Sequence, residues 1–93
     1  MPKLMTLPEY EATHSVTSSG VSTIDMYWNF VQYKLYNIVV NNYRSFDAVK
    51  DTISDANWGL QHIELEYKYG NKTPLLDAYK QQFEFIIKQL QAL

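Results

Sequence analysis

Apolar residues recur in alternating steps of three and four along three separate stretches of this sequence. Steps of this size place side chains on one face of an α-helix, which has about 3.6 residues per turn. In the last stretch, the apolar positions are Leu76, Tyr79, Phe83, Ile86, Leu90 and Leu93. In the middle stretch, they are Phe46, Val49, Ile53, Ala56, Leu60, Ile63 and Tyr67. The pattern predicts an all-α fold.

The first of the three stretches differs from the others because it is apolar on two sides. One side carries Ile24, Trp28, Val31, Leu35 and Ile38. The opposite side of the same helix carries a second stripe, made of Met26, Phe30, Tyr33, Asn37 and Val40. A helix that is apolar all round is expected to be covered all round. This helix therefore needs more neighbours than the other two.

Capping residues predict where the helices begin. Ser22 or Thr23 can cap the first helix, Ser45 can cap the second, and Thr73 followed by Pro74 marks the third. The helices are expected to span about residues 23–43, 46–69 and 74–93. Similar lengths and short connections predict a three-helix, up-down-up antiparallel bundle that forms a single domain over residues 23–93.

Residues 1–22 differ in composition from the helical part. The segment 13–22 reads THSVTSSGVS, and its Ser and Thr side chains compete with helix by hydrogen bonding to nearby backbone. We expect an irregular or extended N-terminal arm, either loose or anchored on the helices through apolar residues such as Leu4, Leu7 and Tyr10.

The second apolar stripe of the first helix has no partner in a lone three-helix bundle. The arm is one candidate to cover it, and a second copy of the chain, packed across a two-fold axis, is another. Phe85 points away from the stripe of the last helix and is expected to be exposed in a monomer. We therefore predict a homodimer with an interface drawn from Met26, Phe30, Tyr33, Asn37, Val40 and Phe85.

Composition excludes several classes of function. The chain has 8 basic and 10 acidic residues, so its net charge of −2 argues against binding to nucleic acid. It has no cysteine, which excludes disulfides and thiolate zinc sites and fits a reducing compartment. No apolar run approaches the roughly 18 residues of a membrane span, and the N-terminus lacks the apolar core of a signal peptide. We expect a cytoplasmic protein that does not bind membranes.

Three carboxylates follow one another at steps of four at the start of the second helix: Asp47, Asp51 and Asp55. This acidic ladder lies on one helix face and is a candidate contact for a basic partner. Acids near a helix N-terminus also complement the helix dipole, and Lys50 lies close by. We favour this second reading.

Trp58, His62 and Glu66 are likewise spaced by four. A zinc or iron site needs three or four ligands, and the other histidine of the chain, His14, is far away in sequence. A surface histidine that stacks on Trp58 is the simpler interpretation. Neither a catalytic group of residues nor a cofactor is predicted, although Trp58 and His62 remain candidates to contact a partner or ligand.

Gly59 lies in the middle of the second helix, where glycine costs about 1 kcal/mol relative to alanine. The missing side chain therefore has a use. Close approach of a neighbouring helix is the explanation that we favour, and a ligand ring lying on the backbone is the alternative.

These features together predict a non-enzymatic protein-interaction module, a small oligomeric adaptor or inhibitor of the kind that phages and mobile elements encode. Eight tyrosines and two tryptophans would supply much of its contact surface. The alternative is a protein that binds a nucleotide-like or cofactor-like small molecule in an aromatic pocket between helices or protomers.

Overall fold

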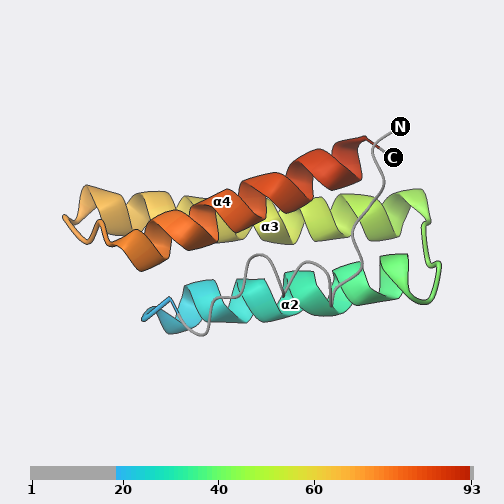
Figure 1. The fold of residues 1–93 in the computed structure, drawn as a ribbon, viewed down its shortest axis with the longest axis horizontal. Coiled ribbons are helices and arrows are strands. Elements are labelled where there is room, and N and C mark those ends of the chain that lie inside the picture. Colours follow the sequence, from blue (N-terminus) through green and yellow to red (C-terminus); the bar gives the residue numbers. More distant parts are fainter. Residues whose placement is uncertain (1–18, 93) are drawn as a thin grey trace.

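The computed structural model describes residues 19–92, which form three helices joined by two short connections (Figure 1). Helix α2 spans Ser22–Val39, α3 spans Phe46–Lys68 and α4 spans Pro74–Gln91. Each helix runs back along the preceding one, which confirms the predicted all-α, up-down-up bundle. The described residues contain no strand and no helix both long and apolar enough to cross a bilayer. Most of the predicted arm, residues 1–18, lies outside them.

Helix α2 ends earlier than the sequence predicted, at Val39 rather than near residue 43. Asn42 adopts a left-handed backbone conformation with φ of 54°, which asparagine tolerates better than most residues. The backbone N–H of Tyr43 then donates to the carbonyl of Asn37 at 3.0 Å. The two consecutive asparagines thus form the turn itself instead of the last turn of the helix.

Helix α2 also begins differently from the prediction. Its N-cap residue is Val21, which offers no side-chain cap, and Ser22 and Thr23 lie inside the helix. The carboxylate of Asp25 instead accepts hydrogen bonds from the backbone N–H and the hydroxyl of Ser19, at 2.8 and 2.7 Å. Asp25 thereby holds the chain that enters the helix and places a negative charge at the positive end of its dipole.

The starts of α3 and α4 confirm the predicted caps. The hydroxyl of Ser45 accepts a hydrogen bond from the backbone N–H of Ala48, at 3.1 Å. The hydroxyl of Thr73 does the same for Leu76, also at 3.1 Å, and Pro74 follows at the first helical position. Each cap pairs one of the N–H groups that the first turn of a helix leaves unpaired.

The core is built from one stripe of α2 and one stripe of α4. The α2 stripe is the first of the two predicted ones, and all five of its residues are buried. The indole of Trp28 lies edge-on to the rings of Tyr79 and Phe83, with ring centroids 5.7 and 5.5 Å apart. The remaining buried α4 residues are Leu76, Gln82, Ile86, Ile87 and Leu90.

Most of the apolar stripe predicted for helix α3 contacts the core: Ala56 and Ile63 are buried, and Val49, Ile53, Leu60 and Tyr67 are half-buried and pack against it. The most buried part of this helix also includes two small residues outside that stripe, Thr52 and Gly59. A Cβ atom placed on Gly59 would lie 2.6 Å from Cζ of Phe83, so the missing side chain makes room for an α4 ring. This close approach is the favoured explanation for Gly59 and is confirmed. Phe46, at the end of the predicted stripe, is 78% exposed.

Candidate interaction surface

The second apolar stripe of α2 lies at the surface. Met26, Phe30, Tyr33 and Val40 are exposed, with Tyr33 the most exposed of them at 70%, and Asn37 is half-buried. Asn29 and Tyr36 lie beside them and are exposed too. We call this surface the outer face of α2, and define it as Met26, Asn29, Phe30, Tyr33, Tyr36, Asn37 and Val40.

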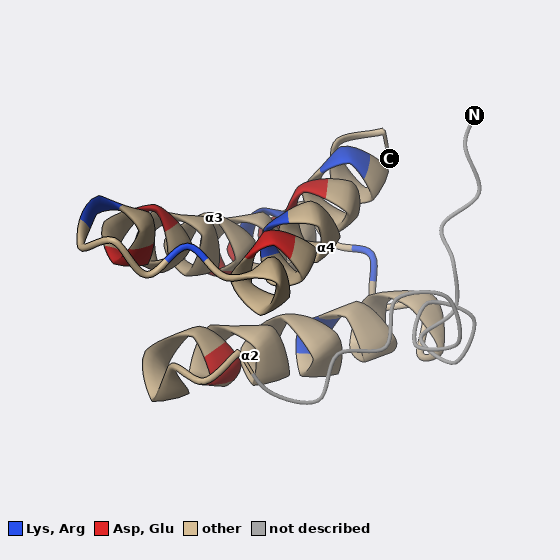
Figure 2. Ribbon diagram, turned by 60° about the vertical axis from the view of Figure 1, so that its left-hand side comes forward, with Lys and Arg blue, Asp and Glu red and all other residues tan. Residues whose placement is uncertain are grey.

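The outer face of α2 carries no charged side chain along its described length. The whole of α2 contains two charged residues, Asp25 and Lys34, whereas charges are frequent on α3 and α4 (Figure 2). Asp25 binds Ser19 at the start of the helix. Lys34 Nζ lies 2.6 Å from Asp51 Oδ2 and 2.5 Å from Asp55 Oδ2. Asp25 therefore points away from the outer face. The ammonium of Lys34 is turned toward α3, and it also lies 6.0 Å from the centre of the Phe30 ring at the edge of the outer face.

The acidic ladder of α3 is partly neutralised by α2. Burial lowers the pKa of Lys34, but hydrogen bonds to Asp51 and Asp55 outweigh that effect and hold the pKa above its ordinary value. The cation is therefore present at every physiological pH. Asp47 and Asp51 are both exposed, and Asp47 lies in the first turn of α3, where it complements the helix dipole. The ladder ties α3 to α2 rather than forming one continuous acidic surface.

Trp58 and His62 lie next to the outer face of α2, across the groove between α2 and α3. His62 stacks on Tyr27 of α2, with ring centroids 5.5 Å apart, and not on Trp58 as predicted. Phe30 meets the same Tyr27 edge-on, at 6.3 Å. Trp58 and His62 share a shallow hollow of about 290 Å³ with Gln61 and Leu65. These contacts extend the aromatic surface from α2 onto α3.

Glu66 does not join His62. Its carboxylate accepts a hydrogen bond from the side-chain amide of Asn71, at 2.8 Å. Within residues 19–92, no three His, Asp or Glu side chains are grouped closely enough to hold a metal ion.

Phe85, predicted to be exposed, is half-buried on α4 and packs against the core. It therefore lies apart from the outer face of α2. Leu65 was not among the predicted residues, although it is exposed beside Trp58. The signal in the sequence was a large apolar residue that lies two positions from Ile63 and from Tyr67, and therefore off the predicted stripe of α3.

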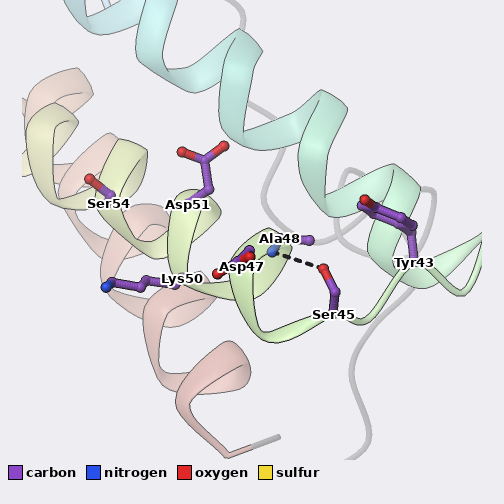
Figure 3. Close-up of a pocket in the computed structure, with 7 residues that line it drawn as sticks. All are labelled: Tyr43, Ser45, Asp47, Ala48, Lys50, Asp51 and Ser54. Atoms are coloured by element: carbon purple, nitrogen blue, oxygen red, sulfur yellow. Dashed lines mark hydrogen bonds between the residues drawn. The ribbon is translucent and has the colours of Figure 1, made fainter.

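A hollow of about 720 Å³ surrounds the turn that leads into α3 (Figure 3). It is lined by Tyr43, Ser45, Asp47, Ala48, Lys50, Asp51 and Ser54. The carboxylate of Asp51 and the amine of Lys50 point to different sides of α3, so the charged groups do not converge on one point. A smaller hollow of about 420 Å³ near the C-terminus of α4 is lined by Phe46, Val49, Lys50, Ile53, Leu90 and Gln91.

Comparison with protein-family models, with curated protein sequences and with solved structures finds no match to this chain.

Proposed function

We propose that this chain is a non-enzymatic protein-interaction module that binds a protein partner through the outer face of α2. One observation carries the proposal: an 18-residue helix turns a row of aromatic and apolar side chains to solvent with no charge among them. Charged residues normally make up about a quarter or more of a soluble protein surface. A helix face that lacks them and is rich in Tyr, Phe and Met has the composition of an interface core.

The neighbouring part of α3 supports the same surface. Trp58 and Leu65 are exposed beside the aromatic contacts that join Phe30, Tyr27 and His62. Interface hot spots are enriched in Trp and Tyr, because these rings bury a large area at a small cost in side-chain entropy. The proposed docking surface is therefore the outer face of α2 extended by Trp58 and Leu65.

The alternative, a small-molecule binder with an aromatic pocket, has less support. The rings of Trp28, Tyr79 and Phe83 pack against one another in the core and leave no hollow between them among those described. In the hollow beside the turn into α3, the charged groups of Lys50 and Asp51 diverge instead of converging on one ligand position.

The proposal includes a role as an adaptor or inhibitor, of the kind that phages and mobile elements encode. It also includes a location in the cytoplasm. The absence of cysteine from the chain supports a reducing compartment.

Photo-crosslinking in the cells that encode the protein tests the proposal. Tyr33 on the outer face and Tyr69 at the end of α3 are 70% and 72% exposed, so they form a matched pair. Each is replaced in turn by p-benzoylphenylalanine, the cells are irradiated, and adducts are identified by mass spectrometry. We expect a protein adduct at position 33 that is absent at position 69. Identical adducts at both positions, or no adduct at position 33, would overturn the proposal.

A further inference from the structure

The outer face of α2 is palindromic about Tyr33. Three residues before and after Tyr33 lie two aromatic residues, Phe30 and Tyr36. Four residues before and after it lie two asparagines, Asn29 and Asn37. Seven residues before and after it lie two aliphatic side chains, Met26 and Val40. The face therefore presents the same order of side-chain types when it is read from either end.

We propose that the partner of this face is a second copy of the chain, bound through an antiparallel α2–α2 contact with a two-fold axis at Tyr33. This inference rests on the proposed function, because it names the partner of the same surface. In a two-fold interface the same patch is used by both subunits, and residue i meets residue j while j meets i. A palindromic helix face satisfies this condition when its partner runs in the opposite direction.

The pairs that follow from this register are chemically matched. Tyr33 meets the same residue of the second copy at the axis, where the face is most exposed. Phe30 then lies opposite Tyr36, Met26 opposite Val40, and Asn29 opposite Asn37. An asparagine amide both donates and accepts hydrogen bonds, so two amides can pair across the axis. The hydrogen bond that Asn37 Oδ1 accepts from Asn41 leaves the two N–H groups of Asn37 available for this pair.

Charge also favours a second copy over a charged partner. A two-fold axis brings identical groups together, so a charged side chain near the axis would face its own charge. No residue of the outer face of α2 is charged, and the ammonium of Lys34 at its edge is paired with Asp51 and Asp55. The polar groups of the face are amides and phenols, which are donors and acceptors at once. Antiparallel helices also place the positive end of one dipole beside the negative end of the other.

The contact is small, which sets its expected strength. Met26 and Val40 are 14 residues apart, or roughly 21 Å along the helix axis. Standard interfaces use about 20–30 residues on each side, more than the seven of the outer face together with Trp58 and Leu65. We therefore expect a dissociation constant in the micromolar range, on the order of 10 µM.

Sedimentation equilibrium of the purified full chain tests the assembly, over about 1 to 200 µM so that the range spans the expected dissociation constant. We expect a reversible monomer–dimer equilibrium for the wild-type chain. Tyr33→Glu puts two like charges at the axis and should weaken the dimer at least about tenfold. Tyr69→Glu adds the same charge at a residue of equal exposure and should leave the equilibrium unchanged. A monomeric wild-type chain, or equal dimerisation of the two variants, would overturn the proposal.

Disulfide trapping tests the register, since the chain has no cysteine of its own. Phe30→Cys and Tyr36→Cys proteins, mixed and oxidised, should form a crosslinked heterodimer, while each alone should crosslink far less. Residues 30 and 36 are six positions apart, so two identical thiols would be offset by roughly 9 Å along the helix. Tyr69→Cys is the control for random collision. Homodimers of Phe30→Cys that form as readily as the mixed product would overturn the antiparallel register.

The two proposals fail in different ways. If photo-crosslinking at position 33 captures another protein while the purified chain sediments as a monomer, the outer face is a docking surface and the second copy is the wrong partner. If position 33 captures nothing, both proposals are wrong.

Discussion

Tyr79 connects α4 to α2 through a buried hydroxyl. Its side chain is 1% exposed, and its hydroxyl donates a hydrogen bond to the carboxylate of Asp25. Burial, with the negative charge and the hydrogen bond of Asp25 as smaller causes, raises the pKa of Tyr79 to about 12. The neutral phenol is therefore the form that the folded state requires.

Because the pKa of Tyr79 is raised in the folded state, we expect the protein to lose stability at alkaline pH. In the unfolded chain a tyrosine releases its proton at about pH 10. Between about pH 10 and about pH 12, Tyr79 therefore keeps its proton in the folded state but loses it in the unfolded state. The contribution of Tyr79 to the free energy of unfolding is then complete below about pH 10 and decreases as the pH rises through this window. Urea denaturation at pH 8 to 11.5 should show a steeper decrease for the wild-type chain than for Tyr79→Phe, which has no proton to lose. Parallel decreases would contradict the raised pKa.

At the scale of the helices, periodicity predicted the buried faces of α2 and α4 but only part of that of α3. The predicted stripe included Ala56 and Ile63, which are buried, but it missed Thr52 and Gly59, which are not apolar side chains and are buried too. Thr52 is tolerated there because its hydroxyl donates to the carbonyl of Ala48 within the same helix, at 2.8 Å. These small residues let the core rings approach the α3 backbone, and Gly59 was the one signal of this approach in the sequence.

Replacement of Gly59 tests that close contact. Alanine is favoured over glycine in a helix by about 1 kcal/mol, but its Cβ would lie 2.6 Å from a Phe83 ring held in place by Trp28. Overpacking of this kind typically costs about 1–3 kcal/mol. We therefore expect Gly59→Ala to be neutral or destabilising by up to about 2 kcal/mol in chemical denaturation, and Gly59→Leu to be worse.

Two comparisons make the Gly59 result specific. Asn57→Ala, at an exposed position of the same helix, should stabilise by a few tenths of a kcal/mol, about what propensity alone predicts. Combining Gly59→Ala with Phe83→Leu should lower the free energy of unfolding by less than the sum of the two single changes, because the smaller leucine leaves room for the new Cβ. Stabilisation by Gly59→Ala equal to the propensity gain would show that the ring moves freely.

The outer face of α2 was predictable because it depends on one helix alone. Its position follows from spacing, and its exposure in a single chain follows from the number of helices, because a lone three-helix bundle has no helix left to cover a second stripe of α2. The contacts of Tyr27 with His62 and of Lys34 with Asp55 were not predictable in this way. They depend on which side of α2 is occupied by α3, and helical periodicity does not determine the handedness of a bundle.

At the scale of the whole molecule, the core is shallow. Three helices of 18, 23 and 18 residues bury one stripe each, and small domains of this kind have little stability to spare. A dimer that forms only from folded chains adds stability by mass action, because it removes folded monomer from the unfolding equilibrium. The stability of this protein is therefore expected to depend on its own concentration.

Thermal unfolding at several concentrations tests this coupling. A partner present at about 100 times its dissociation constant adds about 2.7 kcal/mol, and each kcal/mol shifts the midpoint of a domain of this size by about 4–8 °C. Between about 5 and 500 µM, the midpoint measured by circular dichroism should rise by several degrees or more for the wild-type chain and for Tyr69→Glu. It should rise much less for Tyr33→Glu, whose monomer keeps the same core because position 33 is 70% exposed. A wild-type midpoint independent of concentration would mean that folding and association at the outer face of α2 are not coupled.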